Sequence, residues 1–478
     1  MALRVWNTLT DQKEELKPIV PGEVGIYVCG ITVYDLLHLG HARFLVAFDT
    51  AVRYLRFSGV KVKYVRNWTD VDDKIIRRAG ERGIAPTVLA AQFIDEARKD
   101  MLELNVVPAD VEPKATEHIA EMVDIIQRLI DKGHAYAVNG DVYFAVRSFP
   151  PYGRLSRRNL DDLLSGARVD TNEQKRDPLD FALWKATKPG EPESVSWPAP
   201  WGRGRPGWHI ECSAMCQKHL GVTFDLHGGG KDLVFPHHEN EIAQSEAASG
   251  KPLANAWLHN GFVTLDSEKL SKSLGNFKTV RDLLQNWDGE ALRTFLLSTH
   301  YRSPINFTYE AVAEADRRVD VLYEAQGKAL AYLAQKKFAG QGKALESALT
   351  AFREAMDDDF NTARAMADLL ALYSQINAKV DGKAAPQEVA DLLESAKVTG
   401  AGLGLGWRPA TEAVLRRRTL AAARKGIDPQ WVAERIEARL LARKEKRYPD
   451  ADAIRAECAA KGVELRDGPA GTDWRVPA

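Results

Sequence analysis

The sequence lacks long apolar runs and is poor in cysteine. No stretch of its 478 residues approaches the ~20 apolar residues of a membrane-spanning helix, and the first residues hold no segment typical of a signal peptide. We therefore expect a cytoplasmic protein with no membrane contact. The cysteines are too few and too scattered for a disulfide framework, so we expect thiols that are candidates for metal binding or catalysis. They are Cys29, Cys212, Cys216 and Cys458.

The chain also has almost no net charge, −1 overall, which by itself argues against nucleic-acid binding. The average conceals one basic segment. Between Thr411 and Arg447 there are eleven Lys or Arg against five Asp or Glu. Such a segment can follow a phosphate backbone, although a solvated helix face would have the same composition.

The first hundred residues predict a βαβ unit. Residues 24–30 ("VGIYVCG") are apolar and β-branched, which is typical of a buried strand, and the helical pattern from Gly40 to Phe57 ends at Ser58-Gly59. A second strand follows at 60–67 ("VKVKYVRN"). Strand, helix and strand in this order predict an α/β fold with a Rossmann-like parallel sheet, whose ligands bind at the carboxyl ends of the strands.

Three later segments differ from this unit in composition. Residues 113–200 end in a run rich in Pro, Gly and Ser, which predicts an insertion that interrupts the parallel fold until about Trp208. From 310 to about 400 the chain is rich in Ala, Glu and Leu with helical periodicity, which predicts a helical bundle. Residues 400–410 ("GAGLGLGWRPA") contain four glycines and a proline and predict a linker to a small basic module.

Two histidines flank a glycine where the first strand's loop enters the first helix. In "HLGH", His38 and His41 surround Gly40 at a helix N-terminus, where unpaired backbone N–H groups and the helix dipole favour an anion. Glycine lets the backbone approach a ligand closely, and the imidazoles can donate hydrogen bonds to phosphate oxygens. Taken alone, such a pair is more often a helix cap.

A lysine-rich loop lies about 230 residues downstream. "KLSKS" contains Lys269 and Lys272 with two serines, a set suited to pyrophosphate. The two motifs in this order resemble the signatures of the class I aminoacyl-tRNA synthetases, HIGH and KMSKS, each with one conservative apolar change. This resemblance implies binding of ATP phosphates by Gly40, His38, His41 and Lys272, with Lys269 and Lys272 on the leaving pyrophosphate and Mg2+ accompanying ATP.

The segment 235–241 ("FPHHENE") is rich in metal-binding side chains. If it is helical, His237 and Glu241 share one face. A metalloprotease motif would need a second histidine one residue after Glu241, and Ile242 stands there instead. Spacing alone leaves capping without a metal as an equal alternative. Zinc accepts thiolate, imidazole and carboxylate together. The candidates are Cys29, Cys212, Cys216, His227, His237, His238, Glu239 and Glu241.

Longer segments resemble the cysteinyl-tRNA synthetase family within class I. These are "GWHIECSAM", "DLHGGGKDLVFPHHENEIAQSEA", "MDDDFNTARA" and the terminal "LRDGPAGTDWR", and the similarity runs through nearly the whole chain. The resemblance places one Zn2+ on Cys29, Cys212, His237 and Glu241, and it places Thr69, Trp208 and His227 around the amino acid. Because four protein ligands usually mark a closed site, a substrate thiolate must enter as a fifth ligand or displace one, and Glu241 is our candidate to yield.

The resemblance implies a cysteine–tRNA ligase that uses L-cysteine, ATP and tRNA(Cys), and we expect a monomer. The alternative is a ligase of the same lineage that joins cysteine to an amino-sugar, which would not need the C-terminal module. The implied organisation has a catalytic domain at 1–112 and 201–250, a connective insertion at 113–200, a lysine-loop and stem-contact region at 251–310, a helical bundle at 311–400, and a linker with a basic anticodon-binding module at 401–478.

Overall fold

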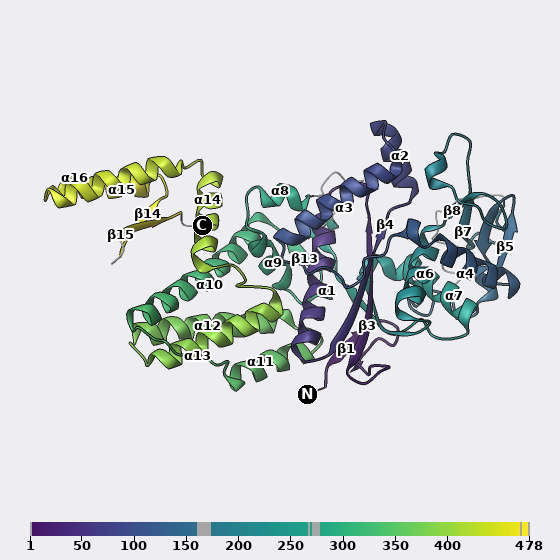
Figure 1. The fold of residues 1–478 in the computed structure, drawn as a ribbon, viewed down its shortest axis with the longest axis horizontal. Coiled ribbons are helices and arrows are strands. Elements are labelled where there is room, and N and C mark those ends of the chain that lie inside the picture. The colour runs from purple at the N-terminus through teal and green to yellow at the C-terminus, as the bar shows by residue number, and fades with distance from the viewer. Residues whose placement is uncertain (1, 160–173, 266–267, 270–277, 469–470, 477–478) are drawn as a thin grey trace.

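The protein has a central parallel sheet with helical regions on both sides (Figure 1). The structure is a computed structural model, and it describes all residues except 1, 160–173, 266–267, 270–277, 469–470 and 477–478. In Figure 1 the sheet lies near the centre, an inserted region lies to the right, and a helical bundle and the C-terminal helices lie to the left. No helix in the described part of the chain is long and apolar enough to cross a bilayer.

The four strands of the central sheet are parallel, in the order β10-β9-β3-β4. This confirms the predicted fold class and both strands of the βαβ unit. A short hairpin of β1 (Arg4–Asn7) and β2 (Gln12–Glu15) packs beside β10. The sheet strands are β3 (Glu23–Thr32), β4 (Lys61–Thr69), β9 (Phe224–Gly230) and β10 (Ala254–Asn260).

Helices cover both faces of the sheet because successive side chains of each strand point to opposite sides. Ile26 and Val28 belong to a core shared with α1 (Leu39–Phe57), the predicted helix. Tyr27 and Cys29 belong to the opposite core, which includes residues of α4, α6 and α7. The other helices of the catalytic part are α2 (Asp73–Arg82), α3 (Pro86–Glu103), α6 (Trp208–Leu220) and α7 (Glu239–Ser249), with the short turns η4 (Lys231–Leu233) and η5 (Val234–His238) before α7.

The region between β4 and α6 contains a second, antiparallel sheet in the order β5-β6-β7-β8. It lies at the right of Figure 1, in the same region as α4 and α6. Its elements are η1 (Ala115–Glu117), α4 (Ile119–Asp131), β5 (Ala135–Val138), β6 (Asp141–Phe144), η2 (Val146–Ser148), β7 (Phe181–Ala186), η3 (Glu193–Val195) and β8 (Gly204–Pro206).

The chain after β10 returns to the start of α1. The backbone N–H of Leu39 donates to the carbonyl of Lys278 (3.1 Å), and that of Val280 donates to Leu37 (2.8 Å). The segment that follows the predicted lysine loop is therefore bonded to the HLGH turn. The elements here are β11 (Val263–Leu265), β12 (Glu268–Lys269), α8 (Val280–Leu284), α9 (Gly289–Leu297) and β13 (Ile305–Phe307).

The predicted helical bundle is confirmed, but the predicted linker is shorter than expected. The last bundle helix runs to Leu403, so only residues 404–409 connect it to the next helix. A Cβ on Gly402 would lie 2.6 Å from the Phe352 ring, so this glycine allows close packing, whereas Gly404 has φ +70° and ends the helix. The bundle consists of α10 (Tyr309–Gln335), α11 (Glu346–Asp357), α12 (Thr362–Asp381) and α13 (Pro386–Leu403).

The C-terminal module has three helices and a two-stranded hairpin around its own small core. The sequence predicts a small basic module here, and the hairpin was not among its expected elements. Thr472 and Trp474 alternate with more exposed neighbours, as expected for a strand with one covered face. The elements are α14 (Ala410–Arg424), α15 (Pro429–Lys444), α16 (Tyr448–Ala460), β14 (Glu464–Gly468) and β15 (Gly471–Arg475).

Candidate active site and metal centre

Four fully buried side chains from distant parts of the chain meet beside β3. Cys29 Sγ lies 3.6 Å from Cys212 Sγ and 3.3 Å from Glu241 Oε1. Nε2 of His237 lies 3.0 Å from the same Glu241 oxygen. All four ligand atoms lie within 4.8 Å of one another, and both cysteines are free thiols. The structure thus brings together the four residues that the resemblance assigns to zinc.

Each member of the cluster is fixed by the element that carries it. Cys29 is on β3 and faces the helices, and Cys212 lies opposite it, near the start of α6. His237 belongs to η5 and Glu241 lies in the first turn of α7, so both face β3 from one side. Next to Cys29, a Cβ on Gly30 would lie only 1.7 Å from the carbonyl oxygen of Asn67, so only glycine permits the close approach of β3 and β4 here.

The side chains of the cluster strongly shift one another's pKa values. Burial opposes ionisation of Cys212, but hydrogen bonds with Cys29 and His237 outweigh it and lower the pKa of this thiol to about 6. Burial also opposes the charge on His237, yet Glu241 and Cys212 raise its pKa to about 10. Burial and the neighbouring Cys212 raise the pKa of Cys29 well above its usual value. Within this buried cluster, His237 favours the charged forms of both Cys212 and Glu241.

The donor set and its spacing fit a tetrahedral zinc ion. Two thiolates bound to such an ion at ~2.3 Å lie about 3.8 Å apart, close to the 3.6 Å between Cys29 and Cys212. A second set of four candidate ligands overlaps the first and contains Cys29, His227, His238 and Glu241. In that set Nε2 of His238 is farther from Glu241, at 3.9 Å. The first set also offers two sulfurs, which suits zinc. Cys216 is buried but belongs to neither set.

Two neighbours of the cluster were not predicted as site residues. His209 lies 2.9 Å from His237, Nδ1 to Nδ1, and burial and the charge of His237 keep the pKa of His209 well below its usual value. His209 therefore accepts a hydrogen bond from His237 and orients it, as partners of metal-bound histidines commonly do. Asn67 accepts from the backbone N–H of Gly30 at 2.7 Å and lies 3.8 Å from Cys212 Sγ. Two features of the sequence could have indicated these residues. They are the polar residues at the end of the second strand and the histidine in "GWHIECSAM".

Of the three residues expected around the amino acid, Trp208 and His227 contact members of the cluster, and Thr69 contacts its neighbour Asn67. Trp208 begins α6, is 38% exposed, and stacks on His237 with 4.2 Å between ring centroids. Thr69 is buried at the end of β4 and accepts a hydrogen bond from Asn67 (3.3 Å). His227 on β9 contacts Glu241 Oε2 through Nε2 (2.8 Å), and its buried Nδ1 has no hydrogen-bond partner among the described residues.

The HLGH turn forms a reciprocal cap at the start of α1. His38 is the N-cap, and its Nδ1 accepts from the backbone N–H of His41 at 3.2 Å. The Nδ1 of His41 accepts in turn from the backbone N–H of His38 at 3.4 Å, and the rings stack. A Cβ on Gly40 would lie 3.0 Å from the His38 ring. Of the lysine loop, the backbone of Lys269 ends β12, and Lys272 lies outside the described residues.

The basic C-terminal segment uses much of its charge inside the fold. Arg417 pairs with Asp316 and Asp320 on α10 (2.7 and 2.8 Å). Arg416 pairs with Asp288 of the catalytic part (2.8 Å). Three of the eleven Lys or Arg that the sequence offers for a phosphate backbone, Arg416, Arg417 and Arg424, thus attach the module to its neighbours.

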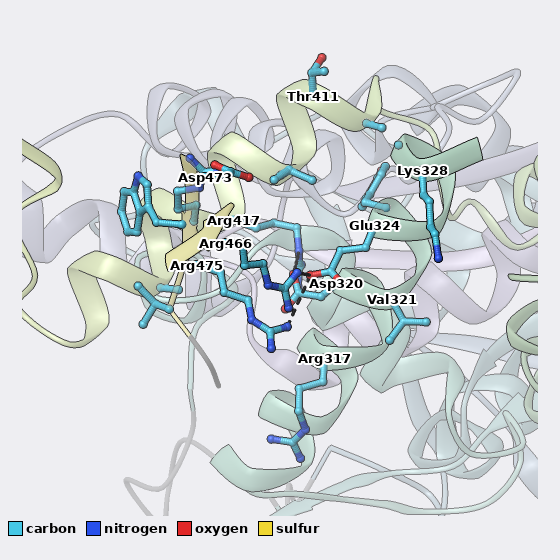
Figure 2. Close-up of a pocket in the computed structure, with 18 of the residues that line it drawn as sticks. Arg317, Asp320, Val321, Glu324, Lys328, Thr411, Arg417, Arg466, Asp473 and Arg475 are labelled. Carbon is cyan, nitrogen blue, oxygen red and sulfur yellow. Dashed lines mark hydrogen bonds and ion pairs between the residues drawn. The ribbon is translucent and has the colours of Figure 1, made fainter. Parts of the chain in front are cut away.

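The module and the bundle enclose a large cleft (Figure 2). It has a volume of about 1450 Å³ and lies between α10, α14 and the β14–β15 hairpin. Figure 2 shows Arg466 and Arg475 extending from the hairpin toward Glu324. Their guanidinium groups lie 3.1 and 3.6 Å from this carboxylate, so the hairpin is tied to α10 at one point.

Comparison with known proteins identifies the family. The model for the class I (C) tRNA synthetase catalytic domain matches residues 15–317, and the DALR domain model matches 351–405. The cysteine–tRNA ligase of Anaeromyxobacter sp. (strain K) is 54% identical over 488 residues, covering all of both chains. This chain belongs to the cysteine–tRNA ligase family. The cysteine–tRNA ligase of Nitratidesulfovibrio vulgaris is 51% identical and covers 99% of this chain and all of its own.

More distant relatives share only the fold of this class I enzyme. Methionyl-tRNA synthetase of Mycobacterium tuberculosis, solved with methionyl-adenylate, has a TM-score of 0.55 at 16% identity, covering 85% of this chain and 94% of its own. LeuRS of Agrobacterium radiobacter K84, solved with tRNA, has a TM-score of 0.57 at 13% identity, covering 81% and 85%. Structural similarity at low sequence identity thus supports the class I fold separately from the close sequence matches.

Proposed function

We propose that this enzyme activates cysteine with ATP, releases pyrophosphate, and transfers the cysteinyl group to the 3′-terminal adenosine of tRNA(Cys). The observation that carries the proposal is the buried Cys29–Cys212–His237–Glu241 cluster, in a chain that matches cysteine–tRNA ligases along its full length. We further propose that it acts in the cytoplasm as a monomer.

Selection of cysteine is assigned to the cluster. Shape alone separates cysteine from serine poorly, because near-isosteres differ by only ~1–3 kcal/mol in an apolar pocket. Zinc, when bound, would supply a Lewis acid that prefers a thiolate and lowers the pKa of a thiol. Glu241 is assigned as the ligand that yields, since its Oε2 already has a second partner in His227 at 2.8 Å. The unpaired Nδ1 of His227 and the half-exposed Trp208 support their assignment to the amino acid.

Activation needs no nucleophile from the protein, because the carboxylate of cysteine attacks the α-phosphate of ATP. Catalysis is then positioning plus charge stabilisation. We assign His38, His41 and Gly40 to the ATP phosphates at the N-terminus of α1, Lys269 and Lys272 to the departing pyrophosphate, and Thr69 to the amino acid. Mg2+ is expected to enter with ATP. The hydrogen bonds between the α1 turn and residues 278–280 support a phosphate site shared by both motifs.

Reading of tRNA is assigned to the C-terminal module at 401–478. Catalysis is assigned to 1–112 and 201–250, with the insertion 113–200 between them, together with the lysine loop in 251–310. The region 251–310 is also assigned the contact with the tRNA stem, and the bundle 311–400 connects it to the module. The amino-sugar ligase alternative would have no use for α14 to α16, yet the matched length of the relatives includes them. That match favours tRNA as the acceptor.

The decisive experiment is the transfer of labelled cysteine to total bacterial tRNA in the presence of ATP and Mg2+. Charging that stops when tRNA is omitted is the expected result. Rapid cysteine-dependent exchange of pyrophosphate into ATP without charging would contradict the proposed acceptor and would favour the amino-sugar ligase. Absence of both activities would contradict the proposed function altogether.

A further inference from the structure

One carboxylate beside the metal centre is buried with an oxygen that is unpaired in the described part of the chain. Glu211 lies in the first turn of α6, directly before Cys212, and is 1% exposed. Its Oε2 has no hydrogen-bond partner there, and the side chains that act on the carboxylate most strongly include no cation. A carboxylate is costly to bury without a cation or a full set of hydrogen bonds, so this one is suited to a ligand.

The ionisable groups that act on Glu211 most strongly are all acidic, namely Cys212, Asp72 and Asp70. Cys212 is assigned to the metal. Asp72 is the N-cap of α2. Both oxygens of Asp70 are occupied, because they accept from the backbone N–H and the hydroxyl of Thr116 (2.9 and 2.6 Å). Glu211 is thus the member of this group that remains for a cation from outside the chain.

The same carboxylate adjoins two residues that are assigned to the amino acid. A hydrogen bond from the hydroxyl of Thr69 favours the charged form of Glu211. The oxygen of this hydroxyl accepts from Asn67 (3.3 Å), so its proton is available for the carboxylate. Trp208 is three positions before Glu211 in α6, and residues with this spacing share one face of a helix. Trp208 is half-exposed, whereas Glu211 is fully buried, so the carboxylate lies at the inner end of this face.

A cysteine molecule held by its sulfur would bring a cation to this place. Two carbon atoms separate the sulfur of cysteine from its ammonium nitrogen, so the nitrogen stays within a few ångströms of the thiolate. Glu211 and Cys212 are consecutive residues, with ~3.8 Å between their Cα atoms. An ammonium group beside the metal centre would therefore meet a carboxylate that has no ion pair to break, and hydrogen bonds between two charged groups are the strong ones.

We propose that Glu211 binds the α-ammonium group of cysteine through its unpaired Oε2, beside the hydroxyl of Thr69. The proposal rests on the proposed function, which makes cysteine the substrate. A metal ion that prefers thiolates would accept other small thiols as well as cysteine. The buried carboxylate adds a second requirement, because a thiol without an ammonium group would leave it unpaired. The metal centre then selects the sulfur, and Glu211 rejects thiols that lack an amino group.

The test compares cysteamine with 2-mercaptoethanol, which has a hydroxyl in place of the ammonium group. Their Kd values are measured by calorimetry on the full-length, zinc-loaded enzyme, and the parent should bind cysteamine about tenfold more tightly. In Glu211→Gln, which keeps the size of the side chain, the Kd of cysteamine should rise about tenfold and that of 2-mercaptoethanol by less than about twofold. The matched control is Glu290→Gln, which should change neither Kd. Glu290 is equally buried in the first turn of α9, but it accepts a hydrogen bond from Tyr323.

Equal affinity of the parent for the two thiols would overturn the proposal without any variant. Equal weakening of both thiols in Glu211→Gln would also overturn it, because that result assigns Glu211 to the support of the metal centre. An unchanged Kd for both thiols would do the same. Binding is measured without ATP or tRNA, and cysteine-dependent pyrophosphate exchange by the parent is measured separately. A preference for cysteamine without exchange would contradict the proposed function and leave this site intact, whereas exchange without the preference would contradict the site alone.

Discussion

His38 and His41 fix each other's tautomer at the start of α1. Nδ1 of each ring accepts a hydrogen bond from the other's backbone N–H, at 3.2 and 3.4 Å, and the ring centroids are 3.5 Å apart. A neutral imidazole whose Nδ1 is an acceptor has its proton on Nε2. The helix cap and the proposed phosphate donors are therefore the same two side chains, so the capping and the functional interpretations of this motif do not exclude each other.

The first prediction separates these two roles of His38. Asparagine is a good N-cap, so His38→Asn should keep α1 stable but remove a phosphate donor and slow cysteine activation by about 10²-fold. His38→Ala should slow activation equally and also lose about 1 kcal/mol of folding free energy. Pyrophosphate exchange and denaturant unfolding measure the two effects. An activation rate for His38→Asn within threefold of the parent would rule out the donor role.

The second prediction concerns the metal. Cys212→Ser should lose bound zinc and, with it, most of the preference for cysteine over serine, since the site then lacks one of its two thiolates. Metal content per chain and the ratio of kcat/KM for the two amino acids are the measurements. Cys216→Ser is the control, because Cys216 is equally buried but outside both sets of candidate ligands. Full zinc occupancy in Cys212→Ser would contradict the assignment.

The third prediction concerns the lysine loop. Lys272→Ala should slow cysteine activation by about 10²–10³-fold, the usual scale for one lost contact to charge that develops in a transition state. Lys269→Ala is the paired variant and should slow the same step. A Lys272→Ala enzyme that exchanges pyrophosphate within threefold of the parent rate would remove this lysine from the mechanism.

The fourth prediction concerns the junction of the catalytic part with the bundle. Arg293 is fully buried, pairs with Asp49, and donates to the carbonyl of Leu403 at the end of α13 (2.7 Å). Arg293→Met leaves Asp49 buried with one charged partner fewer and should lower the free energy of unfolding by about 3 kcal/mol. Arg317→Met, at an exposed position on α10, should stay within ~0.5 kcal/mol. Equal midpoints in urea for the two variants would contradict this role of Arg293.

Local features of this protein follow from the sequence because they depend on neighbouring residues. β3, α1, β4 and the bundle were predicted from apolar periodicity and end signals, and "HLGH" was placed correctly at a helix start. The sequence also showed the side-chain types that bind zinc, namely cysteine, histidine and glutamate. The residue types and their spacing left eight candidate zinc ligands, and only the family resemblance reduced this set to four.

Tertiary structure decided what depends on residues far apart in the chain. Cys29 and Cys212 are 183 positions apart and meet at 3.6 Å only because α6 packs on the face of β3 that carries Cys29. Close packing of Gly402 against Phe352 likewise extended the helix into the predicted glycine linker. Arg417, which the sequence left available for RNA, is paired with Asp316 and Asp320 on α10. Periodicity and capping act within a few residues, whereas such contacts exist only once the elements have packed together.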